Sequence, residues 1–171
     1  MITAICPGSY DPVTMGHVDV ISRAASIFDR VVVGVVGSPR HKTPLFSLDE
    51  RVEFLKEAVG DLDNVEVDVF SELVVEFARR WQAKAIVKGL RVISDFEWET
   101  QMNQLNRHLA PEIETVYVMA SPAVSFVSSS GVKEIAAFGG KVDSLVPDTV
   151  ARRLAEKFPN GRPGAPENPR E

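Results

Sequence analysis

Five short apolar runs rich in valine and isoleucine recur along this 171-residue chain, and segments with the spacing of amphipathic helices separate them. The runs are 2–6, 31–36, 65–69, 84–88 and 115–119. Strands that are apolar on both faces are typical of parallel sheets covered by helices on both sides. The alternation therefore predicts an α/β fold with a doubly wound five-stranded parallel sheet.

The helical segments carry start and stop signals of their own. Ser47 and Glu50 form the ends of a capping box, and Gly60 follows the helix that it opens. The predicted helices cover 18–28, 51–59, 72–81, 96–109, 128–138 and 147–158. From residue 159 the chain is rich in proline and has no large apolar residue to anchor it. We expect one folded domain over 1–158, with two helices after the last strand, and a disordered tail over 159–171.

Charge and cysteine content limit the classes of function. The net charge is −5, so the chain has no basic excess for binding nucleic acid or anionic membranes in general. The single cysteine, Cys6, excludes an internal disulfide framework and a zinc cluster, and its apolar surroundings predict a buried thiol. The chain shows neither a leader pattern nor an apolar segment of membrane-spanning length, and we expect a cytoplasmic protein.

Polar motifs follow four of the five predicted strands. They occupy 8–17, 38–42, 88–91 and 121–130. The carboxyl ends of parallel strands lie along one edge of a sheet, and ligands bind there, where the strand order reverses. We expect these four motifs to converge on a single site.

The first motif, from Gly8 to His17, runs from a strand directly into a helix. Its glycines allow backbone to approach a ligand, and a helix N-terminus offers free N–H groups to phosphate. Ser9 and His17 add further hydrogen-bond donors. Read alone, the motif fits an ordinary turn at Pro12 followed by a helix equally well.

The other motifs add cations and hydroxyl groups. Lys88 and Arg91 flank a glycine at a strand end, where a polyanionic ligand would compensate their charge. The triplet 128–130 supplies serine hydroxyls at a helix start. The basic loop 40–42 fits either a binding site or a solvated surface. The chain lacks a P-loop, a dinucleotide-binding glycine motif and an activated nucleophile, so the site is suited to anions rather than to covalent catalysis.

Together the motifs 8–17, 88–91, 95–99 and 126–130 closely resemble those of bacterial phosphopantetheine adenylyltransferases, which belong to the nucleotidylyltransferase superfamily. The likeness runs from residue 1 to about 158. It implies a Rossmann-like fold and the conversion of ATP and 4'-phosphopantetheine to 3'-dephospho-coenzyme A and pyrophosphate, with Mg²⁺. It also implies in-line attack without a covalent intermediate, a place in coenzyme A biosynthesis, and a cytoplasmic homohexamer.

The resemblance also assigns roles to particular residues. It implies that His17 stabilises charge at the α-phosphate, and it implies no metal ligand in the protein. Contacts with ATP are implied for Ser9, Tyr10, His17, Gly89, Leu90, Arg91, Glu99, Val124, Ser125, Phe126, Val127, Ser128, Ser129 and Ser130. Contacts with phosphopantetheine are implied for Ser9, Lys42, Val74 and Lys88. Val74 owes this role to the resemblance alone, since its own pattern favours helix core.

Some positions depart from the family pattern. Ser9 stands where threonine is common, and Lys88 where arginine is common, so the charge stays but the bidentate fork is lost. The second loop is one residue longer than in some relatives, so either Lys42 or Arg40 could contact the substrate phosphate. Two alternative functions stay open, a sibling nucleotidylyltransferase with another phosphorylated acceptor and an inactive nucleotide-binding regulatory protein.

Overall fold

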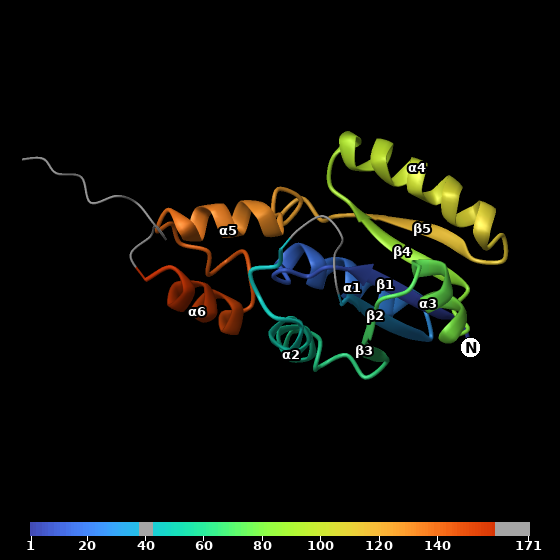
Figure 1. The fold of residues 1–171 in the computed structure, drawn as a ribbon, viewed down its shortest axis with the longest axis horizontal. Helices are drawn as coiled ribbons and strands as arrows, with labels where there is room; N and C mark the ends of the chain where they lie inside the picture. Colours follow the sequence, from blue (N-terminus) through green and yellow to red (C-terminus); the bar gives the residue numbers. More distant parts are fainter. Residues whose placement is uncertain (38–42, 160–171) are drawn as a thin grey trace, which may run out of the picture.

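The computed structural model describes residues 1–37 and 43–159. Five strands form one parallel sheet in the order β3-β2-β1-β4-β5, with helices on both of its faces (Figure 1). The strands are β1 (Thr3–Gly8), β2 (Arg30–Val36), β3 (Val65–Phe70), β4 (Ala85–Leu90) and β5 (Glu114–Met119). The predicted doubly wound five-stranded sheet is confirmed. Within the tail 159–171, residues 160–171 lie outside the described part of the chain.

Two strands run further than their apolar patterns indicate. β1 continues past the predicted end at Cys6 through Pro7 to Gly8, and β4 continues past the predicted end at Lys88 through Gly89 to Leu90. The ladder explains the extension, because Lys88, Gly89 and Leu90 stay paired with β5. Gly89 interrupts the apolar pattern of β4 without ending its hydrogen bonds, so residues 88–90 of the predicted binding motif lie within the strand itself.

In the described part of the chain, six helices connect and follow the strands. They are α1 (Met15–Ile27), α2 (Leu48–Ala58), α3 (Val74–Arg80), α4 (Ile93–Leu109), α5 (Ser129–Ala137) and α6 (Asp148–Lys157). The capping box predicted at Ser47 and Glu50 is present at the start of α2. α1 begins three residues before the predicted position because Thr14 caps it. The first turn of α1 therefore contains Gly16 and His17.

Alternating strand residues bury their side chains in two separate cores, one on each face of the sheet. Cys6 and Val33 pack into the core beneath α1, α2, α5 and α6, whereas Ile5 and Val32 pack into the core shared with α3. Cys6 is 3% exposed, as predicted for a structural thiol, and burial raises its pKa to about 12. Gly34 is required by this packing, since a Cβ there would lie 2.4 Å from the Phe77 ring.

The strand order reverses at β1, which pairs with β2 on one side and β4 on the other. The crevice between the carboxyl ends of β1 and β4 is thus the switch point of the sheet, the usual ligand position in this architecture. Within 1–37 and 43–159, none of the helices has the length and apolar character needed to cross a membrane.

Candidate active site

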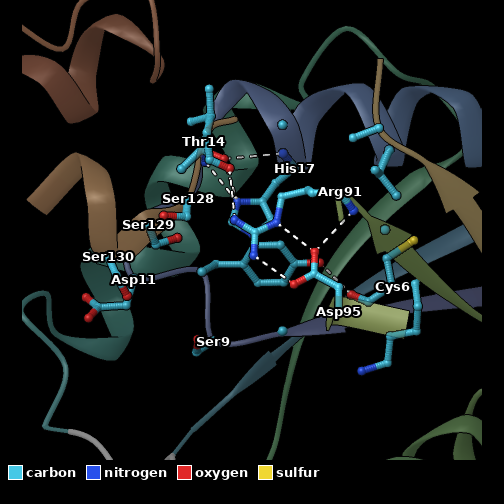
Figure 2. Close-up of a pocket in the computed structure, with 18 of the residues that line it drawn as sticks. Cys6, Ser9, Asp11, Thr14, His17, Arg91, Asp95, Ser128, Ser129 and Ser130 are labelled. Carbon is cyan, nitrogen blue, oxygen red and sulfur yellow. Dashed lines mark hydrogen bonds and ion pairs between the residues drawn. The ribbon is translucent and has the colours of Figure 1, made fainter. Parts of the chain in front are cut away.

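A cavity of about 520 Å³ opens at the switch point. Its wall comes from the end of β1 and the start of α1, from β4 and the start of α4, and from the segment that leads into α5 (Figure 2). Three of the four predicted motifs therefore meet in one place, although they are far apart in sequence. The fourth motif, 38–42, lies outside the described residues, and with it Arg40 and Lys42.

His17 is held in the cavity by a capping box at the N-terminus of α1. The Thr14 backbone N–H donates to His17 Nδ1 at 3.0 Å, and the His17 backbone N–H donates to Thr14 Oγ1 at 3.4 Å. Because Nδ1 accepts a backbone proton, the ring proton must reside on Nε2 when the imidazole is neutral. The box thereby fixes both the orientation of the ring and its tautomer.

The surroundings of His17 keep the imidazole neutral. Burial lowers its pKa from 6.5 to about 4, and the positive charge of Arg91 acts in the same direction. A protonated ring would in addition lose the hydrogen bond that Nδ1 accepts from Thr14. His17 therefore offers a neutral Nε2–H donor at physiological pH, rather than a positive charge.

Tyr10 supports the His17 ring from the side. The two ring centroids lie 5.0 Å apart in an edge-on arrangement, and the Tyr10 hydroxyl donates to the Cys6 carbonyl at 2.8 Å. Tyr10 has a φ of 49° and packs over Gly8, where a Cβ would come within 3.0 Å of the ring. Gly8 is thus needed for a close approach of this aromatic ring.

Asp11 is a buried carboxylate that joins three parts of the chain. It accepts the backbone N–H groups of Leu45 and Phe46, each at 2.9 Å, and the Lys133 ammonium at 2.8 Å. Burial opposes its ionisation, but the Lys133 and backbone hydrogen bonds outweigh burial and lower the pKa of the carboxyl. Asp11 therefore fastens the first motif both to the approach to α2 and to α5.

Arg51 holds the same motif from the protein interior. Its side chain is 1% exposed, and Nη1 donates to the Ser9 carbonyl at 2.8 Å and to the Val36 carbonyl at 2.9 Å. Nη2 donates to the Gly37 carbonyl at 3.2 Å. One buried guanidinium thus ties the end of β1 to the end of β2 and fixes the backbone at Ser9.

The two cations of the motif 88–91, Lys88 and Arg91, each pair with a carboxylate at the cavity wall. Lys88 lies 3.4 Å from Glu99, which stands on α4. Arg91 makes a two-pronged pair with Asp95, with Nε and Nη2 at 3.1 and 3.2 Å from its two carboxylate oxygens (Figure 2). Arg91 also donates to the Val127 carbonyl at 3.4 Å. Carboxylates on α4 therefore hold both cations at the cavity wall.

The serine triplet divides its hydroxyl groups among different tasks. Ser128 caps α5 by accepting from the Gly131 N–H at 3.0 Å, and Ser129 donates to the Pro12 carbonyl at 2.8 Å. Ser130 lines the cavity, and within the described residues its hydroxyl has no hydrogen-bond partner. The first turn of α5 therefore presents a free hydroxyl and helix N–H groups to the cavity.

The structure brings most, but not all, of the predicted site residues to the cavity wall. Those lining it are Ser9, Tyr10, His17, Lys88, Gly89, Arg91, Glu99, Val127, Ser128, Ser129 and Ser130. Leu90, Val124, Ser125 and Phe126 flank the wall along β4 and the segment before α5. Val74 begins α3 and packs against the second core.

Sequence reasoning did not assign a site role to Asp11, Arg51 or Asp95. Each acts through a partner distant along the chain or through a side-chain geometry that a pattern does not encode. Asp11 and Asp95 lie within the motifs 8–17 and 95–99, and Asp95 also lies four residues after Arg91 in the first turn of α4, whereas Arg51 lies in none of the motifs.

Comparisons with known proteins agree with this site. Residues 5–135 match the family model described as cytidylyltransferase-like. A phosphopantetheine adenylyltransferase of Caldanaerobacter subterraneus subsp. tengcongensis is 54% identical over 158 residues, which cover 92% of this chain and 98% of that protein. One of Heliobacterium modesticaldum is 51% identical, over 92% of this chain and 94% of the relative.

The solved structures show the same architecture at much lower sequence identity. A Vibrio parahaemolyticus protein assigned provisionally as a nicotinate-nucleotide adenylyltransferase superposes with a TM-score of 0.68 and 15% identity. The match covers 92% of this chain and 93% of that one, and it supports the fold. On the sequence matches, the chain belongs to the cytidylyltransferase-like family and to the phosphopantetheine adenylyltransferases.

Proposed function

We propose that this chain transfers the adenylyl group of ATP to 4'-phosphopantetheine, giving 3'-dephospho-coenzyme A and pyrophosphate in coenzyme A biosynthesis. The observation that carries the proposal is the position of His17, a fixed neutral donor at a helix N-terminus beside Arg91 in the switch-point cavity. Relatives that are about half identical over nearly the full chain carry the name of this activity.

ATP is proposed to bind between the start of α1 and the start of α5. At the start of α1 the Met15 and His17 N–H groups already donate to Leu145 and Thr14, which leaves the N–H of Gly16. The N–H groups at the start of α5, the Ser130 hydroxyl and the Arg91 guanidinium provide further donors for the phosphates. The Val127 carbonyl, which already accepts from Arg91, links the guanidinium to the segment before α5. Such an arrangement would place the α-phosphate near His17 and the leaving pyrophosphate near the serines.

The phosphate of the acceptor is proposed to lie near Lys88 and Ser9, with Lys42 contributing from the second loop. Lys88 lines the cavity, where its ammonium lies 3.4 Å from Glu99, so a bound phosphate would share this cation with the Glu99 carboxylate. Val74 is proposed to contact the pantetheine arm.

In the proposed reaction an acceptor phosphate oxygen attacks the α-phosphorus in line. A bond from that oxygen to the α-phosphorus forms as the bond to the pyrophosphate oxygen breaks. His17 Nε2–H donates to an α-phosphate oxygen as negative charge develops there, which is where preorganised donors contribute most. The site needs no nucleophile of its own, and reactions of this kind depend mainly on positioning and charge stabilisation.

The donor set of the cavity does not suit a protein-held Mg²⁺. Its three carboxylates, Asp11, Asp95 and Glu99, each already face a cation. Within the described residues, no group of three His, Cys, Asp or Glu side chains is arranged for a metal. We propose that Mg²⁺ accompanies ATP as part of the substrate, with phosphate oxygens as its ligands.

A cytoplasmic homohexamer is proposed as the working assembly. Support comes from α4, which lies beside β4 and β5 (Figure 1). This helix exposes several large apolar side chains. Ile93, Phe96 and Leu105 are 82%, 49% and 58% exposed. An apolar patch of this kind is typical of a protein interface.

The test is pyrophosphate release from ATP and Mg²⁺ with three acceptors offered separately. They are 4'-phosphopantetheine, nicotinamide mononucleotide and glycerol 3-phosphate. Release with phosphopantetheine alone is expected. Release with another acceptor would replace the substrate while keeping the reaction type, and ATP binding without release would favour the inactive regulatory protein.

A further inference from the structure

Asp19 lies on α1 two residues after His17, and its carboxylate binds the segment that follows β5. Its two oxygens accept from the Ser121 backbone N–H at 3.0 Å and from the Ser121 hydroxyl at 2.7 Å. Burial opposes ionisation, but the two Ser121 bonds outweigh it and lower the pKa of the Asp19 carboxyl. The ionised carboxylate of Asp19 therefore accepts two hydrogen bonds from the same residue, Ser121.

Ser121 is the first residue after the last hydrogen bond that β5 and its extension make with β4. The preceding residue, Ala120, lines the cavity and still donates its N–H to the Leu90 carbonyl. After Ala120 the path of the chain is set by contacts with α1 instead of strand pairing. The Asp19 bonds are the first of these contacts.

Other contacts fasten the same segment to α1. Arg23 pairs with Asp19 at 3.6 Å and donates to the Met119 carbonyl at 2.5 Å. A Cβ on Gly16 would lie 3.4 Å from the Val124 carbonyl and 3.8 Å from that of Val127, so the segment runs close to the α1 backbone. These contacts align residues 119–127 with the helix that carries His17.

We propose that Asp19 is a positioning residue for ATP. Its bonds to Ser121 fix the start of the segment 121–128 against α1. That segment leads into α5, so Asp19 sets the position of the N–H groups and hydroxyls at the start of α5 relative to His17. The inference rests on the proposed function, since it assigns ATP to the start of α5. Of the groups proposed for the acceptor, Ser9 directly follows β1, Lys88 stands on β4 and Val74 begins α3, and none of the three makes a described contact with Asp19.

The experiment compares the parent with Asp19→Ala, Asp19→Asn and Ser121→Ala. KM for ATP, KM for 4'-phosphopantetheine and kcat are measured together with ATP affinity by calorimetry. Asp19→Ala is expected to raise KM and Kd for ATP about tenfold, a change of about 1.4 kcal/mol, while KM for the acceptor changes less than twofold. Asp19→Asn, which keeps an acceptor oxygen, is expected to fall between the parent and Asp19→Ala.

Asp29→Ala is the matched control. Asp29 also accepts a backbone N–H, from Ile2 at 2.6 Å, but it lies at the opposite end of the strands. It is expected to leave both KM values unchanged. If Asp19→Ala proves unstable, the ATP affinity of Ser121→Ala tests the proposal instead. This variant removes the hydrogen bond between the Ser121 hydroxyl and Asp19 without changing any residue of α1.

Two results would overturn the inference. One is an active parent whose ATP affinity is unchanged in both Asp19→Ala and Ser121→Ala. The other is a parallel rise of both KM values, which would show a general structural role. A parent that neither binds ATP nor releases pyrophosphate would instead refute the proposed function and the inference with it, and the parent alone shows this.

Discussion

At the scale of single residues, His17 combines a role visible in the sequence with a constraint visible only in the structure. Its place after a strand and at a helix start follows from the pattern in 8–17. Its tautomer follows from the Thr14 N–H bond to Nδ1, and its neutrality from burial and from Arg91. A motif can thus locate a donor, whereas packing determines which atom carries the proton.

The state of His17 can be read directly by nitrogen-detected NMR, with His17→Gln used to assign its signals. We expect the Nε2–H tautomer at pH 7 and a pKa near 4. An Nδ1–H tautomer, or titration near 6.5, would contradict the capping-box argument.

The same pKa shift affects stability. Between pH 6.5 and about 4 the unfolded chain binds the His17 proton more readily than the folded chain does. The contribution of neutral His17 to the free energy of unfolding is therefore complete above pH 6.5 and is lost as the pH falls towards 4. The free energy of unfolding of the parent should fall relative to His17→Gln by up to about 1.4 kcal/mol per pH unit in that window. Chemical denaturation of both proteins at several pH values measures the difference, and parallel curves would contradict the assignment.

Substitution of His17 by alanine should act on turnover rather than on ATP affinity. A donor that acts on charge developing at the α-phosphate contributes mainly to the transition state, and loss of one such donor costs about 100-fold or more in kcat. We expect Kd for ATP to change less than threefold in calorimetry. An equal loss in kcat and in affinity would make His17 chiefly a binding residue.

At the scale of elements, the start of α1 is held by side chains from elsewhere in the chain. Asp11 links it to Leu45, Phe46 and Lys133, and Arg51 links Ser9 to the end of β2. Periodicity predicted the strands and helices themselves, but it placed the ends of β1 and β4 two residues early, because Pro7 and Gly8 in β1 and Gly89 in β4 interrupt the apolar pattern while the pairing continues. Hydrogen bonds and ion pairs between residues far apart in the chain leave no local sequence pattern, so these could not be predicted from the sequence.

Asp11→Asn tests the fastening of the first motif. The amide can accept only through one oxygen, so one backbone N–H loses its acceptor and Lys133 loses its ionised partner. We expect a loss of about 2–4 kcal/mol in the free energy of unfolding, measured with urea. Glu66→Gln, which breaks the exposed pair with Arg30, should cost about 1 kcal/mol or less. Equal costs for the two variants would refute the role assigned to Asp11.

At the scale of the whole molecule, the order of the strands explains why the site stands where it does. Reversal at β1 leaves the crevice into which three sequence motifs project. Fold class and site location could therefore be predicted from strand-like runs and the motifs that follow them. The exposed apolar side of α4 could not be predicted from the sequence, because its apolar residues fit a buried core as well as an interface until their exposure is known.

Light scattering tests the proposed assembly. Six chains of 18.8 kDa would give about 113 kDa. Leu105→Glu places a charge on the exposed side of α4 and should shift the mass toward that of a single chain, since an unpaired charge is costly in an interface. A parent mass of one chain would refute the hexamer, and an unchanged mass in the variant would remove α4 from the interface.

Direct adenylyl transfer in the switch-point cavity is tested most directly by the stereochemistry of the reaction. ATP carrying a single sulfur at the α-phosphorus, in one diastereomer, is converted with 4'-phosphopantetheine, and the configuration of the product is determined. Inversion is expected, because the proposed reaction is a single in-line displacement without a covalent intermediate. Retention would show two displacements through an enzyme-bound adenylyl group and would contradict direct transfer.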